Sequence, residues 1–214
     1  MVKAMASRVA GLRLTAIVFV LLVPILLLSH LTLNNLRREI ALREREATGV
    51  LLANVVMPVA IGIADGSLDS TKGAAELAKG KAFAADLGMD KAYAEMTAKV
   101  ASPAMAKGDK LFHLVRSINM IGTQSSLLLD TDPETTFLAQ TNVQNLPELL
   151  LSFHDLHTVL QTSIATNGID AAEIREFLFK LGGLDVAIER TRNSVVRAQA
   201  SSGSEKTASS NSQL

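Results

Sequence analysis

The stretch LTAIVFVLLVPILLLSHLTLNNL, residues 14–36, decides how this chain is organised, because it contains no charged residue. A helix rises about 1.5 Å per residue, so the mostly apolar residues 14–33 would span roughly 30 Å, the thickness of a bilayer's hydrocarbon core. No later stretch is as long and as apolar. The sequence therefore predicts a basic tail at 1–13, a transmembrane helix at 14–33, and a large remainder on one side of the membrane.

A cleaved signal peptide is the alternative interpretation of this segment. Its apolar stretch is longer than the roughly 7–15 residues of a signal-peptide core, and it ends in SHLTL, residues 29–33, without a small-residue cleavage pattern. An uncleaved single-pass anchor is therefore favoured. The Lys and Arg residues that flank the span nearly tie in number, so charge alone orients it weakly. The short, purely basic tail favours a cytoplasmic N-terminus.

Composition narrows the class of the remainder. The chain has 214 residues and a formal net charge of zero, so nothing indicates nucleic-acid binding. It has no Cys, which excludes disulfides, thiolate metal sites and Cys nucleophiles. Aromatic residues make up only 4% of the sequence, whereas Ala and Leu are abundant. This balance is typical of packed helices, and we predict an all-α fold.

Apolar residues recur at helical spacing beyond the anchor. The first helix is expected to continue outward to about Met57, with an apolar seam at Leu36, Ile40, Ala47, Val50 and Met57. Further helices are expected at 74–87 with an interruption at Gly80, at 90–128 with a break that Ser102-Pro103 could introduce, from Pro133 to about 166, and from Asp170 to about 200. Their seams contain Leu111, Leu114, Ile118, Ile121, Ser125 and Leu128; Leu146, Leu149, Phe153, Leu156 and Leu160; and Ile174, Phe177, Leu181, Leu184, Ile188 and Val195.

Heptad-like seams joined by short connections favour an up-and-down four-helix bundle with coiled-coil-like packing over residues 34–200. Long helices of this kind also favour a homodimer. After Ala200 the composition changes to SSGSEKTASSNSQL, which is too polar to bury a core. Residues 201–214 are therefore predicted to be a disordered tail.

Two histidines are the first candidates for chemistry. His154 and His157 share one helix face, and His113, Asp155 and Glu148 are the only nearby candidates for further metal ligands. No His lies three residues after a Glu, the spacing of di-metal bundle proteins. We therefore interpret the histidines as partly exposed helix residues and predict no metal site.

The other polar candidates also favour structural roles. Asp130 and Asp132 flank a helix start, where they are explained best as caps and turn formers. Gly182-Gly183 favours close helix approach or a kink over a ligand notch. A group of arginines could hold a small carboxylate ligand but is explained better as solvated helix surface; it consists of Arg116, Arg175, Arg190, Arg192 and Arg197. No nucleotide-binding, hydrolase or metalloprotease motif occurs, so we predict no enzyme, catalytic residue or cofactor.

One stretch is more specific than periodicity. SSLLLDTDPETTFL, residues 125–138, is followed by NLPEL at 145–149, and the segment after the anchor, 36–41, is LRREIA, with Gly49 further on. Together these resemble the sensor ectodomains of bacterial transmembrane receptors, including methyl-accepting chemotaxis proteins, sensor histidine kinases and diguanylate cyclases. Thr136 and Phe137 stand where that family has paired tyrosines.

The resemblance implies a periplasmic sensory input domain in the bacterial inner membrane, with a small-molecule ligand that the sequence does not identify. Such receptors continue into a second membrane span and a cytoplasmic output module. These 214 residues end in a Ser-rich stretch instead, so we expect a truncated receptor. A stand-alone anchored bundle that serves as an interaction or scaffold protein is the alternative.

Overall fold

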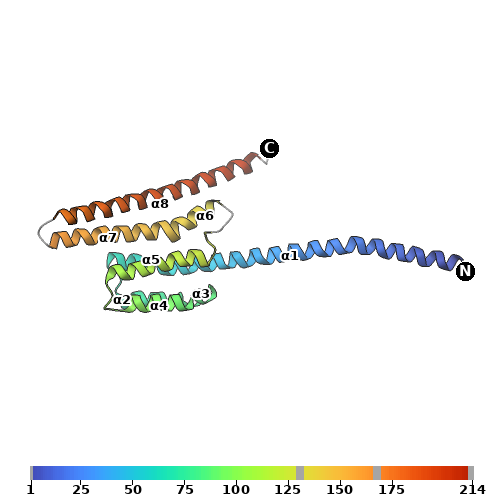
Figure 1. Ribbon diagram of the computed structural model, residues 1–214, viewed down its shortest axis with the longest axis horizontal. Helices are drawn as coiled ribbons and strands as arrows, with labels where there is room; N and C mark the ends of the chain where they lie inside the picture. Colours follow the sequence, from blue (N-terminus) through green and yellow to red (C-terminus); the bar gives the residue numbers. More distant parts are fainter. Residues whose placement is uncertain (1, 129–132, 166–169, 212–214) are drawn as a thin grey trace. The chain divides into compact units, whose positions relative to one another are not determined.

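All regular secondary structure is helical in the computed structural model, which describes the backbone of residues 2–128, 133–165 and 170–211 (Figure 1). The expected all-α class is therefore confirmed. In chain order the helices are α1 (Val2–Asp65), α2 (Ser70–Ala78), α3 (Lys81–Asp86), α4 (Asp90–Ala101), α5 (Lys107–Gln124), α6 (Pro133–Gln140), the π-helical turn η1 (Thr141–Asn145), α7 (Leu146–Ala165) and α8 (Ala171–Asn211).

The chain divides into two compact units, Met1–Glu44 and Arg45–Leu214. In the first unit, large apolar side chains of α1 are exposed, among them Ile25 (60%) and Leu28 (64%). Among the residues whose placement is described, Ile25–Asp65 is the one helix that is long and apolar enough to cross a membrane, with a mean hydropathy of 2.0 in its most apolar stretch. Length and composition are thus consistent with the expected span.

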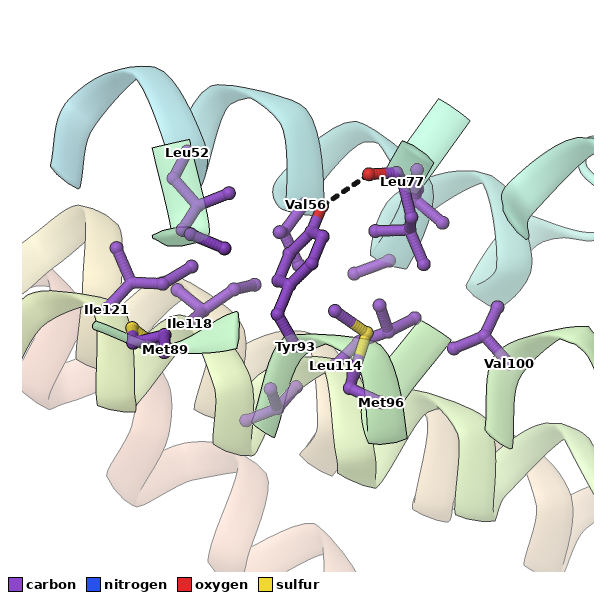
Figure 2. Packing of buried hydrophobic residues seen from close by; sticks show 14 of the residues in the cluster. Leu52, Val56, Leu77, Met89, Tyr93, Met96, Val100, Leu114, Ile118 and Ile121 are labelled. Atoms are coloured by element: carbon purple, nitrogen blue, oxygen red, sulfur yellow. Dashed lines mark hydrogen bonds between the residues drawn. The ribbon is translucent and has the colours of Figure 1, made fainter. Parts of the chain in front are cut away.

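The hydrophobic core belongs to the second unit. Side chains from the C-terminal part of α1 pack against those of α2, α4 and α5 (Figure 2). Tyr93 on α4 is buried at the centre of this group, and its hydroxyl donates a 2.6 Å hydrogen bond to the backbone carbonyl of Leu77. Burial raises the pKa of Tyr93 to about 12. The fully buried members are Leu52, Val56, Ala60, Leu77, Ala84, Val100, Leu111, Leu114, Ile118 and Ile121.

The seam predicted for α1 is wrong except at Met57, which is half-buried and packs against the core. Leu36, Ile40 and Val50 are exposed, whereas the helix buries the face that contains Gly49, Leu52, Val56, Val59 and Ile63. Apolar residues occur on all sides of this part of α1, so their spacing in the sequence does not show which face is buried. A Cβ atom at Gly49 would lie 2.2 Å from the Cβ of Ser125, which shows how closely α1 approaches the end of α5.

The helix expected at 90–128 is two helices, because the break that Ser102-Pro103 could introduce does form. Ser102 is extended (ψ 120°), as expected before proline, and α5 begins at Lys107. The chain turns back here, and α4 packs beside α5 (Figure 1). The predicted interruption at Gly80 is confirmed by the boundary between α2 and α3. The predicted seam of α5 is buried from Leu111 to Ser125.

Two helix starts agree with the sequence. Pro133 is the first residue of α6; the candidate caps Asp130 and Asp132 lie outside the described residues. At the start of α8, Asp170 Oδ1 accepts from the backbone N–H groups of Ala172 (2.7 Å) and Glu173 (2.8 Å). Glu173 in turn accepts from the Asp170 N–H, so the two residues form a reciprocal cap of the capping-box type.

The end of α8 differs from the expectation of a disordered tail. The helix continues to Asn211, through most of the Ser-rich stretch that follows Ala200. This stretch contains no Pro and only one Gly. Extending an existing helix fixes one residue for each added hydrogen bond, and the polar residues here disfavour helix by less than about 1 kcal/mol each.

Candidate functional site

A cavity of about 350 Å³ lies between the end of α1, the start of α5 and the middle of α7. One part of its wall is apolar and the other part is charged or titratable. The apolar residues are Ile61, Ala64, Leu150 and Phe153, and the polar residues are Asp65, Lys107, His154 and His157. The two histidines that share a helix face in the sequence therefore share a cavity as well.

Helix ends position the polar groups of this cavity. Asp65 is the last residue of α1, and Gly66 ends the helix with a positive φ of 82°. The Asp65 carboxylate accepts a 2.8 Å hydrogen bond from the Ser67 N–H, which lowers the pKa of Asp65. Lys107 is the first residue of α5 and follows Ala106, which is extended and gives the helix no side-chain cap. These helix ends bring a carboxylate and an ammonium group to the cavity.

His154 is held close to α5. A Cβ atom at Gly108 would lie 3.3 Å from His154 Nε2, so the absence of a side chain at Gly108 gives the imidazole its room. Burial lowers the pKa of His154, and the charge of Lys107 lowers it further, against the opposing effect of Asp155. The imidazole is therefore neutral at pH 7, and it offers one donor and one acceptor nitrogen.

His113 lies elsewhere, in a smaller cavity of about 190 Å³ between α4 and α5. It shares that cavity with Glu95 and Lys99, which form a 2.7 Å ion pair, and with Arg116. Asp155 pairs with Lys180 (2.6 Å) and Glu148 with Arg190 (3.4 Å). Within the described ranges, no three His, Asp or Glu side chains group closely enough to hold a metal ion.

The five candidate arginines do not meet at one site. Arg116 lines the smaller cavity, and Arg175 donates to the carbonyl of Ala171 in its own helix. Arg192 lies 3.5 Å from Glu189, and Arg197 lies over the ring of Phe137 at 5.9 Å. Arg190 pairs with Glu148 as described above. The interpretation of these arginines as helix surface and inter-helix contacts agrees with their positions.

Gly182-Gly183 does not mark a close approach. A Cβ atom at either glycine would meet nothing within 4 Å, and α8 continues through both residues. Close helix packing is therefore not the reason for this pair. Of the two predicted explanations, close approach is wrong and a kink stays a prediction.

An apolar surface on the α7–α8 pair is the second candidate site. The two helices run antiparallel side by side (Figure 1), and they are joined by Asp155–Lys180, Glu148–Arg190 and a buried 2.7 Å hydrogen bond from Asn145 to Ser194. Nine exposed apolar side chains flank this contact, and we call them the α7–α8 outer face. They are Leu146, Phe153, Leu160, Ile164, Ile174, Leu178, Leu181, Ile188 and Val195.

Helical geometry places six of these nine side chains on one side of the pair. On α7, Leu146 and Ile164 each follow an inward-facing residue, Asn145 and Ser163. On α8, four apolar residues each follow a residue that faces α7. They are Ile174 after Glu173, Leu181 after Lys180, Ile188 after Ala187 and Val195 after Ser194. In an antiparallel pair of helices, the residue that comes directly after a contact residue points to the same side of the pair on both helices. These six side chains therefore lie on the same side of the α7–α8 contact.

The sequence did not reveal how these elements combine. Lys107 and Asp65 carry no motif, and only the turn at Ser102-Pro103 and the end of α1 bring them to the histidines. No protein-family model matches this chain, and neither a curated protein nor a solved structure shows significant similarity to it.

Proposed function

We propose that this chain is a membrane-anchored, extracytoplasmic sensory input domain of a signal-transduction receptor, of the chemotaxis or two-component type. One observation supports this most. The single helix α1 contains the apolar segment at 14–33 and also contributes Ile61, Ala64 and Asp65 to the cavity wall. A molecule that binds in the cavity would therefore contact the helix that enters the membrane.

Packing along α1 supports transmission of a small movement. Leu52, Val56 and Val59 are fully or almost fully buried against the other helices of the core. Close-packed side chains do not deform continuously, so a ligand that moves the end of α1 favours a second packing of the whole face. Helix displacements of about 1–2 Å are typical of such transitions.

The proposed topology follows from the anchor. The N-terminus lies in the cytoplasm of a bacterial cell, residues 14–33 cross the inner membrane, and the helices from Arg45 onward form a periplasmic up-and-down bundle. Support comes from the basic tail and from the exposed apolar side chains of α1. The resemblance of residues 125–149 to receptor ectodomains supports the same orientation.

A homodimer is part of the proposal, and the outer face supports it. The exposed fractions of its nine side chains add up to those of about four fully exposed side chains. Single exposed apolar residues are normal on a protein surface, whereas a group of them marks an interaction site. A second copy is the partner that the membrane anchor keeps close.

Fusions test the topology. Alkaline phosphatase, which is active only outside the cytoplasm, is joined to the full chain after residue 214 and, in parallel, before residue 1. We expect activity from the C-terminal fusion and none from the N-terminal one, with both proteins in the membrane fraction. An inactive C-terminal fusion in intact membranes, or release of the protein into the soluble fraction, would contradict the proposal.

Crosslinking tests the dimer, and the absence of native Cys makes it clean. Leu181→Cys places a thiol on the outer face, and Gly183→Cys places one two residues away in open space on the same helix. With a short bis-maleimide reagent in membranes, we expect a dimer band from Leu181→Cys and little from Gly183→Cys. Equal crosslinking of the two variants, or none in either, would contradict the homodimer.

The exposed area of the outer face also favours a second candidate function, a stand-alone interaction or scaffold protein. A scaffold would use the outer face, whose Phe153 also lines the cavity, and would bind no small molecule there. Thermal unfolding of the full chain in detergent, screened against organic acids, amino acids and divalent cations, separates the two. A ligand that raises the unfolding temperature supports a sensor, and no shift from any of these classes supports a scaffold.

A further inference from the structure

We propose that the cavity between α1, α5 and α7 binds a small organic monocarboxylate with an apolar body, and that Lys107 receives its carboxylate. The inference deepens the proposed sensory function, on which its biological meaning rests. It depends on three features of the cavity, namely its charge, its apolar wall and its size.

The wall of the cavity contains one cation, Lys107, and one carboxylate, Asp65, whose pKa is lowered by its hydrogen bond from the Ser67 N–H and further by the charge of Lys107. The Lys107 ammonium has no ion-pair partner within 4.0 Å among the described residues. The acidic residue in the wall, Asp65, already accepts the Ser67 N–H at 2.8 Å, so its carboxylate is partly satisfied within its own turn. His154 and His157 add imidazole nitrogens that can donate a hydrogen bond. A carboxylate would thus meet one cation and up to two further donors.

The opposite wall suits an apolar body. Phe153 is 61% exposed and Ile61 is 48% exposed, although both line a concave site, and Leu150 and Ala64 lie beside them. A ligand that covers these side chains removes their apolar surface from water. The polar side and the apolar side together match an amphiphilic molecule better than a sugar or an inorganic anion.

Size and charge limit the ligand to one carboxylate. A volume of about 350 Å³ lies at the lower end of the roughly 300–1,000 Å³ that is usual for small-molecule sites. A second carboxylate would have to lie near Asp65 or against the apolar wall, and both positions disfavour a negative charge. Two imidazoles without a third close ligand do not form a metal site, which argues against a divalent cation.

The test compares an acid with its neutral isostere. Phenylacetate and phenylacetamide have almost the same shape, and hexanoate and acetate vary the apolar body. Binding to the full chain in lipid nanodiscs is measured by calorimetry, with thermal unfolding as a second readout. We expect phenylacetate to bind at least about ten times more tightly than phenylacetamide, and hexanoate more tightly than acetate.

Variants assign the preference to Lys107. Lys107→Met should bind the acid and the amide equally, whereas Lys107→Arg keeps the cation and should retain the preference. The matched control is Lys99→Met, which removes a lysine from the smaller cavity. Because Lys107 is exposed at a helix start, none of these changes opens the core.

Equal binding of phenylacetate and phenylacetamide by the native chain, or a preference that survives in Lys107→Met, would overturn the inference. So would a blank for all four compounds. A blank for the carboxylates together with stabilisation by an amino acid or a divalent cation would leave the sensory function standing and reject only this ligand class. The topology fusions test the proposed function independently of any ligand.

Discussion

Replacing Gly49 by Ala tests how α1 packs on α5. Gly49 is buried, and a new Cβ atom would lie 2.2 Å from Ser125 Cβ and 2.3 Å from Ser125 Oγ. Ordinary contacts between carbon atoms are about 3.5–4.0 Å. Ser125 is itself fixed, because its hydroxyl donates a 2.6 Å hydrogen bond to the carbonyl of Ile121. The helices must therefore separate by more than 1 Å, or the end of α5 must unwind.

The expected change in the free energy of unfolding is the sum of two opposing effects. Overpacking a close contact typically destabilises a protein by about 1–3 kcal/mol. Ala favours the helix over Gly by about 1 kcal/mol, which offsets part of this cost. The clash here is severe and involves a fixed partner, so we expect a net loss at the upper end, about 1–2 kcal/mol. For a protein of this size, such a loss lowers the unfolding temperature by roughly 2–8 °C.

The assay is thermal unfolding of the full chain in detergent, followed by circular dichroism. Gly182→Ala is the matched control, because its Cβ meets nothing within 4 Å, and it should raise the unfolding temperature by roughly 2–4 °C. Ser125→Gly removes the clashing atoms and should reduce the damage of Gly49→Ala in the double variant. If Gly49→Ala is as stable as the Gly182→Ala control, the close approach of α1 and α5 is refuted.

Three further outcomes are expected in the same assay. Tyr93→Phe should cost only about 0.5–1.5 kcal/mol, because it removes one hydrogen bond to the carbonyl of Leu77 and keeps the ring in the core. His154→Gln should weaken the pH dependence of stability. The pKa of His154 in the folded protein lies below the unfolded value of 6.5. The native protein is therefore fully stable above this pH and loses stability as the pH falls below it. Asn145→Ala should lower stability by about 0.5–1.5 kcal/mol, because it removes one buried hydrogen bond while the Ser194 hydroxyl keeps its bond to the carbonyl of Arg190.

Local signals in the sequence predicted much of the helix order. Gly80 separates α2 from α3, Pro133 opens α6, and the pair Asp170 and Glu173 caps α8. Each of these effects acts through the backbone within a few residues, so neighbouring sequence is sufficient to anticipate it. The seam of α5 was also predictable, since polar residues such as Lys107 and Arg116 separate its apolar positions.

Long-range features could not be predicted in the same way. The buried face of α1 depends on Gly49 meeting Ser125, which lies far away along the chain. The cavity depends on three helix segments that meet only after the turn at Ser102-Pro103 has formed. Lys107 therefore has no local signature, although it supplies the charge on which the ligand inference depends.

The seams of α7 and α8 show why a correct pattern can still mislead. The seam predicted for α8 consists of Ile174, Phe177, Leu181, Leu184, Ile188 and Val195. Leu184 is buried and Phe177 is half-buried, whereas the other four, at a regular spacing of seven residues, are exposed. In the structure, the adjacent face of α8 makes the contact with α7, and it includes small or polar residues such as Ser194.

On α8, serine and alanine side chains face α7, whereas isoleucine and leucine side chains are exposed. A domain that folds without a partner usually has the opposite pattern. Leu146, Phe153 and Leu160 repeat the arrangement on α7, again at seven-residue spacing. On both helices the exposed apolar residues lie beside the inter-helix contact at a regular spacing. Scattered surface leucines, which are normal on any protein, show no such pattern. A regular seam on both helices instead indicates that each helix carries two contact faces. One face joins α7 to α8, and the proposed homodimer would place a second pair of helices against the other.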